Sequence, residues 1–550
     1  MKRLPKPLLT LLDEGIAPAF RKLHEKRRDR IARVFMAHQK AINRKPAWDN
    51  PEKLAIEVVE FLAGRLAALT GEIEHLHHLL DDFNYRYGRA NTVRDRQARI
   101  LDFSRQLGAG YWQLWGDRRA FSRWFGHDAI TERCLRRIAA KEADLIFVLN
   151  LMGALSEKAL SEGAGSGLQR QTWQQLKLEH HVTGLLTYSG DNRVRLHAFQ
   201  CLVSAIRVLD AQLRPNSVAQ NTLRFIYRCA LESREDTWIQ AEALHLLRHL
   251  SPATLETVLE KRIKQAKPGD DFFVRRRCAV LMGGISDQLS NGPALYLAAA
   301  GDPSPFVRQG AAESAAEALQ KTDDPQVRQV LQALAEKDAC PEVRAKALIA
   351  CTDIIDDRRY SDAVAEWWTG CLVRESNVFV RRTVLQAIRM GADRLAGASP
   401  DRLQRFCDAV IPVLEDRHVN ADNVSVRRWC AQTREWLLVL AKPALRDLFY
   451  HLKPRLQAIR PGKSLKLPAR LFSETGFGRF YRVLSVIAQT DYGFTVSNAL
   501  GGIRIWRADT YVFRLWRLFF ELFHPSPYKR QGYRHTIGRT LTGRVRVPSA

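Results

Sequence analysis

The sequence predicts an all-α solenoid of stacked helix pairs, preceded by a helical N-terminal region and followed by a small, basic module of mixed structure. Three observations predict this fold class. A Val-Arg pair recurs through the middle of the chain, apolar residues follow helical spacing around it, and the pattern stops near residue 440. The segments are 1–165, 166–440 and 441–550. At 550 residues the chain is too long for one compact core.

The repeat is a valine and an arginine, followed three residues later by a small or apolar side chain. Apolar residues at helical spacing give each helix one buried stripe, which only neighbouring helix pairs can cover. A degenerate pair, Ile239-Gln240, fills the long gap after the first member. The other members are Val194-Arg195, Val274-Arg275, Val307-Arg308, Val343-Arg344, Val380-Arg381 and Val426-Arg427.

Helix-start signals accompany the repeat. Asp302-Pro303, Asp324-Pro325 and Cys340-Pro341 place a cap or near-cap residue before a proline, whose missing N–H costs nothing in the first turn of a helix. A further pair, Val327-Arg328, predicts an extra helix near 325–335. We interpret the recurring arginines as structural. Each is expected to lay its stem over the preceding unit and to bond to an acidic group there, such as Asp302 or Asp338.

Two segments, Asp302 to Ala311 and Asp338 to Ala347, match the pattern Asp-x-x-x-x-Val-Arg-x-x-Ala in full. Here the sequence resembles the HEAT-repeat family, whose members are armadillo-like α-solenoids, and in particular its short bacterial type, the kind found in PBS lyases. The resemblance covers about half the chain and implies architecture without a catalytic residue. It favours a non-enzymatic scaffold or adaptor that binds a protein partner on the solenoid surface.

The N-terminal region is predicted to contain two long helices, at 51–80 and 131–160. Between them lies an aromatic and basic stretch, Tyr111 to Phe125. We interpret it as the capping core at the end of the solenoid, with base stacking or a partner anchor as alternatives. The glycine-rich segment Ser161 to Gly167 is predicted to be a flexible linker and the clearest boundary in the chain.

The C-terminal segment is strongly basic. Residues 440–550 hold 20 Lys and Arg against 5 Asp and Glu, which gives +15 of the total +26. Strand-like pieces are predicted at 493–496 and 503–506. A helix predicted at 511–523 is apolar over most of its circumference, so it is buried on the last repeat, held in a membrane interface or bound in a partner's groove. Its candidate contact residues are Phe513, Trp516, Phe519, Phe520 and Phe523.

Two alternative functions rest on this basic segment. Glycines beside arginine and threonine after residue 528 favour phosphate contacts, and hence nucleic-acid binding. The candidate residues are Lys529, Arg530, Arg534, Arg539, Arg544 and Arg546. Peripheral attachment to a membrane through 511–523, with basic residues beside it, is the other alternative. The strand-like end after Thr542 raises the hypothesis that the chain is part of a longer protein.

No motif for catalysis, metal or cofactor binding is recognised, so an enzyme is the less favoured class. His75, His77 and His78 stand before two aspartates, but only the first and third share a helix face. We interpret them as a solvated helix end rather than a metal site. Nine scattered cysteines are typical of a reducing compartment, and the apolar run after Lys6 is too short for a signal peptide. The protein is therefore predicted to be cytoplasmic.

Overall fold

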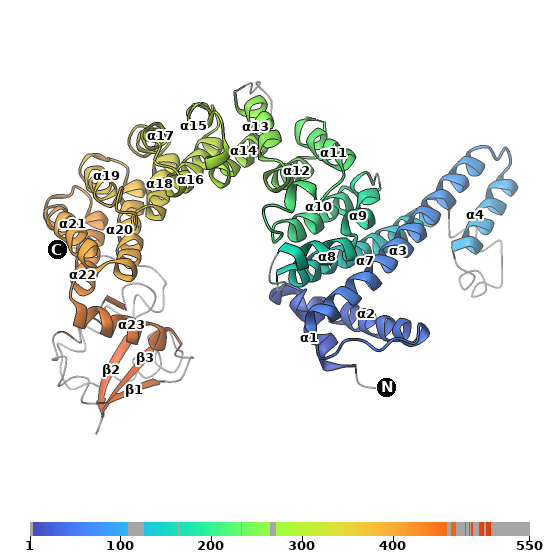
Figure 1. Cartoon of the computed structure of the whole chain (residues 1–550), viewed down its shortest axis with the longest axis horizontal. Coiled ribbons are helices and arrows are strands. Elements are labelled where there is room, and N and C mark those ends of the chain that lie inside the picture. The colour runs from blue at the N-terminus through green and yellow to red at the C-terminus, as the bar shows by residue number, and fades with distance from the viewer. Residues whose placement is uncertain are drawn as a thin grey trace. The chain divides into compact units, whose positions relative to one another are not determined.

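The structure is a computed structural model, and its described residues fall into two compact units, Met1–Ala299 and Ala300–Ala550. Figure 1 shows the elements of both units, and each unit is described by itself. The division falls inside the predicted repeat segment of 166–440. The residues described are 4–107, 126–161, 166–188, 190–232, 234–264, 271–458, 464–468, 479, 483, 486–487, 494–499 and 502–507.

All the described elements of unit 1 are helices. They are α1 (Lys6–Glu14), α2 (Arg21–Ala41), α3 (Pro51–Gly88), α4 (Val93–Leu107), α7 (His127–Ser161), α8 (Ser166–Leu176), α9 (Leu178–Leu186), α10 (Asn192–Ile206), α11 (Gln220–Leu231), α12 (Thr237–Leu250), α13 (Pro252–Leu259), α14 (Phe272–Gly284) and α15 (Gly292–Ala300). Short turns of 3-10 or π-helix join some of them, at Pro18–Phe20, Arg214–Asn216, Glu260–Lys264 and Ser286–Gln288.

The two long helices predicted in the N-terminal region are confirmed as α3 and α7, which pack side by side over much of their length (Figure 1). Helix α3 begins where the side chain of Asn50 accepts a hydrogen bond from the Lys53 N–H, with a proline in its first turn. It runs beyond the predicted end because its apolar stripe continues to Phe83, whose ring stacks on Phe103 of α4 at 4.2 Å between centroids.

The helix pairs of unit 1 share one design. The first helices are α9, α11 and α13, and the second helices α10, α12 and α14 stack side by side, with α7 against α10. Each second helix begins at an aspartate N-cap whose carboxylate accepts a backbone N–H of the first turn. These caps are Asp191, Asp236 and Asp271. We call the exposed side of α10, α12 and α14, with the adjoining part of α7, the second-helix face.

Unit 2 begins with the second helix α16, continues the same pattern over three helix pairs and ends in a small sheet. Its second helices α16, α18, α20 and α22 stack in chain order, and α17, α19 and α21 pack beside one another as the other layer. The extra helix predicted at 325–335 is confirmed as α17. The helices are α16 (Pro305–Lys321), α17 (Pro325–Glu336), α18 (Pro341–Ala350), α19 (Ser361–Arg374), α20 (Val378–Ala398), α21 (Pro400–Asn420), α22 (Val424–Leu440) and α23 (Pro443–Gln457), with a 3-10 turn at Cys351–Asp353.

The core of unit 2 contains Trp368 of α19, which is fully buried. Its indole Nε1 donates a hydrogen bond to the Leu348 carbonyl oxygen at 3.0 Å, and its ring meets Phe406 edge to face. Gly391 of α20 lies directly beneath the ring, where a Cβ atom would stand 2.7 Å from Cη2. A glycine is therefore required at this position for the two helices to approach so closely.

The C-terminal strands form one antiparallel sheet in the order β1-β3-β2. The strands are β1 (Ser464–Pro468), β2 (Phe494–Ala499) and β3 (Gly502–Arg507). In this register Leu465 and Val496 both pair with Ile505. The strand-like pieces predicted at 493–496 and 503–506 are confirmed by β2 and β3. The predicted fold class, an all-α solenoid, is confirmed by the helix pairs of both units.

Candidate binding face

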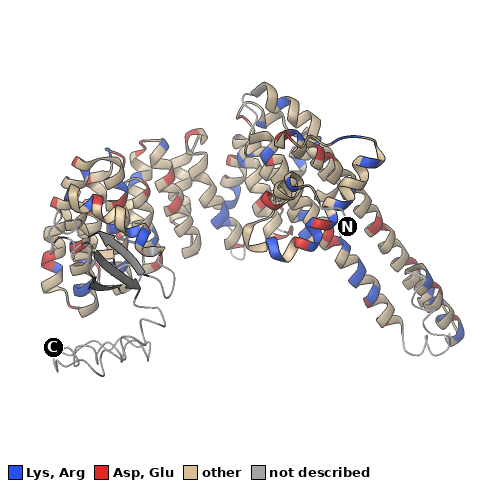
Figure 2. Cartoon of the chain, turned by 90° about the horizontal axis from the view of Figure 1, so that it is seen from below, with Lys and Arg blue, Asp and Glu red and all other residues tan. Residues whose placement is uncertain are grey.

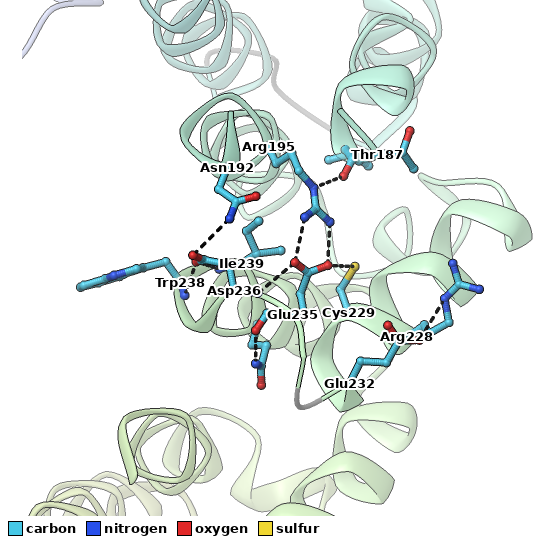
Figure 3. Close-up of polar contacts among 12 residues, drawn as sticks. Thr187, Asn192, Arg195, Arg228, Cys229, Glu232, Glu235, Asp236, Trp238 and Ile239 are labelled. Carbon is cyan, nitrogen blue, oxygen red and sulfur yellow. Dashed lines mark hydrogen bonds and ion pairs between the residues drawn. The ribbon is translucent and has the colours of Figure 1, made fainter. Parts of the chain in front are cut away.

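An ion pair links successive helix pairs at the repeated arginine, as Figure 3 shows for unit 1. The guanidinium of Arg195 donates to both carboxylate oxygens of Glu235, at 2.8 and 2.6 Å, and its Nε donates to the Leu186 carbonyl at 2.9 Å. Burial alone would raise the pKa of Glu235, but the hydrogen bonds from Arg195 and the Asp236 N–H hold it below its ordinary value. The pair is therefore charged at neutral pH.

The same contact repeats in unit 2. Arg308 holds Asp338 at 2.7 and 3.0 Å, Arg344 holds Glu375 at 2.8 and 3.1 Å, and Arg381 pairs with a carboxylate further along. In each case the carboxylate belongs to the following unit, so the predicted bond to an acidic side chain of the preceding unit is wrong. The cause is geometric: a side chain in the first turn leans toward the helix N-terminus, and there it reaches the loop before the next second helix.

The residue just before the repeated Val-Arg pair is an exposed aromatic in several repeats. Trp238 is 59% exposed and Phe379 is 52% exposed, and Phe306 is also exposed. In unit 1 the rings of Trp238 and Phe273 lie 4.8 Å apart, while Trp238 points away from the Arg195–Glu235 contact (Figure 3). Single exposed apolar residues are ordinary, but packing does not require an aromatic that recurs at one repeated position.

A groove of about 340 Å³ lies on the second-helix face of unit 1. Side chains of four helices line it, so no single segment of the sequence contains it. Trp238 and Phe273 stand one helical turn from two of its lining residues, Glu242 and Arg277, because each pair is four residues apart on its helix. The lining residues are Asn150, Gly153, Gln200, Cys201, Val203, Ser204, Glu242, His245 and Arg277.

Polar side chains cross the floor of this groove from α10 to α14. Gln200 donates to Glu242 at 3.1 Å, the Nδ1 of His245 lies 3.8 Å from Glu242, and Arg277 Nη2 lies 3.4 Å from the same Nδ1. Burial would raise the pKa of Glu242, but its contacts with His245 and Gln200 lower it. The carboxylate is therefore charged and already engaged, whereas the buried Nε of Arg277 has no hydrogen-bond partner in the described part of the chain.

A second buried carboxyl group, that of Glu142 of α7, allows a test of how burial raises the pKa of a carboxyl group. Tyr188 donates to its Oε1 at 3.1 Å, yet burial, with a smaller effect from Asp191, raises the pKa of Glu142 above its ordinary 4.5. The stability that this group contributes is full below pH 4.5 and is lost as the pH rises through the folded-state pKa.

Replacing Glu142 by glutamine removes this ionisation but keeps an oxygen for Tyr188. The stability of Glu142→Gln relative to the wild type should therefore rise between about pH 4 and about pH 8. Hydrogen exchange of α7 in both proteins at the two pH values measures it. A relative stability that stays constant or falls over this interval would contradict the assignment.

The site residues predicted from the sequence lie elsewhere in the chain. Every residue of the 511–523 helix and of the basic set from Lys529 to Arg546 lies outside the described residues, as does the stretch Tyr111 to Phe125. His75, His77 and His78 lie within α3. In the part of the chain that the structure describes, there is no group of three or more potential metal ligands. None of the described helices combines the length and the apolar run needed to cross a bilayer.

The second-helix face itself was not predicted as a site. One signal was present in the sequence, because an aromatic residue precedes the Val-Arg pair in several repeats. The groove carried no such signal, since its lining residues come from helices up to about a hundred residues apart. Figure 2 shows basic and acidic residues interspersed along the helices of both units, so charge alone does not mark the face either.

Stacked helix pairs joined by a repeated arginine define the chain as a helical-repeat protein of the α-solenoid class. A sequence model of HEAT repeats matches residues 259–351, from α13 to the end of α18. Residues 259–351 are thus HEAT repeats, and the resemblance stated from the Asp-x-x-x-x-Val-Arg pattern is confirmed. No curated protein matches the chain in sequence.

Solved structures of karyopherins are similar to the chain over most of its length. Kap121p has a TM-score of 0.36 and 13% identity, covering 97% of this chain and 64% of that one. Kap121p bound to Pho4p has 0.36 and 12%, with coverage of 97% and 65%. Kap95p, in a structure with RanGDP, has 0.34 and 12%, with coverage of 97% and 71%. The chain thus spans less than two thirds of the length of Kap121p. These scores are too low to carry the function of those proteins over to this chain.

Proposed function

We propose that the chain is a non-enzymatic helical-repeat scaffold that binds a protein partner on the second-helix face of unit 1. One observation carries the proposal: the exposed Trp238 packs against the half-buried Phe273, and both rings stand at a repeated position beside a groove. Interface hot spots are enriched in tryptophan and lie next to desolvated pockets, and here the pocket and the rings share one face. The array supplies a rigid support, because the Arg195–Glu235 pair fixes α10 against the loop before α12.

The free thiols agree with a reducing compartment, so a cytoplasmic location is part of the proposal. All nine cysteines are unpaired, and eight of them are buried. Burial raises the pKa of several of these thiols to about 12, among them Cys201 at the groove and Cys278 of α14. Such thiols are packing residues and not nucleophiles at neutral pH.

Removing both rings should weaken partner binding by at least about tenfold, because hot-spot aromatics contribute about 2 kcal/mol or more to binding. The fold should stay intact, because Trp238 is exposed and Phe273 is only half-buried. The experiment compares full-length wild type with Trp238→Ala/Phe273→Ala in affinity capture. Proteins recovered with the wild type are identified by mass spectrometry, and the most enriched one is then titrated, in purified form, against both chains.

A matched control is Tyr85→Ala on α3, which removes an aromatic side chain with the same 59% exposure on a different surface. It should bind the purified partner as tightly as the wild type. Equal affinity of the wild type and the double variant would remove the second-helix face of unit 1 as the binding surface.

A further inference from the structure

We infer that the groove on the second-helix face of unit 1 takes an extended acidic peptide, in which an aromatic or large apolar residue stands two positions from a carboxylate. This inference rests on the proposed function and specifies the chemistry of the partner. Three observations support it: the distance between the aromatic pair and Arg277, the charges that line the groove, and the ion pairs that already engage the neighbouring arginines.

The spacing follows from helix geometry. Phe273 and Arg277 are four residues apart on α14, and Trp238 and Glu242 are four apart on α12, so the ring pair lies about 6 Å along the helices from the polar side chains. In an extended segment, residues i and i+2 point to the same side and lie about 6.6 Å apart. An extended peptide that runs along α14 can therefore place the side chain of residue i on the rings and the side chain of residue i+2 at Arg277.

The charges of the groove select the second side chain. Glu242, the only carboxylate among the described residues that line the groove, already accepts from Gln200 and lies near His245. Arg277 has a buried Nε without a hydrogen-bond partner in the described part of the chain, and its Nη2 meets only a histidine nitrogen at 3.4 Å. A carboxylate in the groove would be an acceptor for the terminal Nη atoms of Arg277, which lines the groove, whereas the buried Nε stays out of its reach.

The neighbouring arginines favour a peptide over a nucleic acid. Arg193 is paired with Asp191 at 2.6 Å, and Arg207 is paired with Glu157 at 2.6 Å. Binding of a phosphate backbone needs several cations along its path, and these two arginines are already paired. One arginine in need of an acceptor, beside two aromatic rings, matches a single carboxylate beside an apolar anchor.

An immobilised array of decapeptides tests the inference with the purified full-length chain. Each peptide has a glycine-serine background with tryptophan at its fifth position. It carries a single Glu, Gln or Lys, which is placed at each of the remaining positions in turn. The wild type should bind best when Glu stands two positions from tryptophan. Replacement of that Glu by Lys should weaken binding at least about tenfold, because one charge-assisted hydrogen bond is lost.

A charge reversal in the protein makes the test specific. Arg277→Glu should reverse the preference at this position from Glu to Lys, which also shows that the variant is folded, whereas Arg224→Glu on α11 should leave it unchanged. A wild type without preference for Glu, or a preference that Arg277→Glu does not alter, would overturn the inference. So would a 20-nucleotide single strand that binds the wild type and is lost with Arg277→Gln.

The two proposals fail in different ways. If Trp238→Ala/Phe273→Ala loses the captured partner but the array shows no acidic preference, the acidic peptide is excluded and the binding face stands. If the double variant keeps its partner while the array shows the Arg277-dependent preference, the groove binds acidic peptides and the captured partner uses another surface.

Discussion

Replacing Asp338 by alanine is expected to destabilise unit 2 by about 3 kcal/mol, at the low end of the cost of leaving a buried charge without its partner. Asp338 accepts two hydrogen bonds from Arg308 and one from the Cys340 N–H at 2.8 Å. The side chains of Asp338 and Arg308 are only 5% and 16% exposed. The low end applies because Arg308 would keep its bond to the Asp302 carbonyl oxygen at 2.9 Å. Urea denaturation of the full chain, with hydrogen exchange resolving α16 and α18, measures the loss.

The matched control is Asp353→Ala, which breaks the ion pair with Arg394. Its side chains are 56% and 39% exposed, so the loss should stay below about 1 kcal/mol. Replacing both partners, as in Arg308→Met/Asp338→Ala, should restore part of the stability that the single variant loses, because no charge is left buried alone. Equal losses for Asp338→Ala and Asp353→Ala would show that the repeated arginine does not hold the helix pairs together.

Two glycines of α20 are expected to respond to alanine with opposite signs. At Gly391 the added Cβ would lie 2.7 Å from Cη2 and 2.8 Å from Cζ3 of Trp368. The ring is fully buried and fixed by its bond to Leu348, so it cannot move aside without cost. We expect Gly391→Ala to destabilise unit 2 by about 1–3 kcal/mol.

Gly397 is the control within the same helix. Apart from its two chain neighbours and the nearby backbone of its own helix, nothing lies within 4 Å of the Cβ that alanine would add there. Gly397→Ala should therefore raise stability by up to about 1 kcal/mol through helix propensity and a less flexible unfolded chain. Thermal unfolding of both variants beside the wild type measures the two shifts. Stabilisation by Gly391→Ala would contradict the close approach of α19 and α20.

The helix pairs could be predicted because their causes are local. The Val-Arg pairs, the helix-start prolines and the apolar spacing each act within a few residues, and they located α16, α17 and α18. The direction of the arginine contacts could not be predicted. Whether Arg308 contacts the preceding or the following helix pair depends on how one pair stacks on the next, and this stacking is a property of the assembled array.

The groove could not be predicted from the sequence either, because it too depends on how the helices stack. Gln200, Glu242 and Arg277 lie on three different second helices and become neighbours only when those helices stack. Trp238 and Phe273 could have been proposed from the sequence, because both precede the repeated pair. A single sequence does not show, however, which aromatic residues are exposed. The basic residues predicted as nucleic-acid contacts, such as Arg539 and Arg544, lie outside the described residues, and nucleic-acid binding through them stays a prediction.

Photo-crosslinking from inside the groove tests the central claim most directly, because it captures whichever protein occupies the groove in the cell. Ser204 lines the groove, whereas Arg224 is exposed on the first helix α11. Each is replaced in the full-length chain by p-benzoylphenylalanine and irradiated in cells. We expect a discrete protein adduct from position 204 that disappears with Trp238→Ala/Phe273→Ala, and no such adduct from position 224. Adducts from position 224 alone, or an adduct at 204 that survives loss of both rings, would contradict binding at the second-helix face.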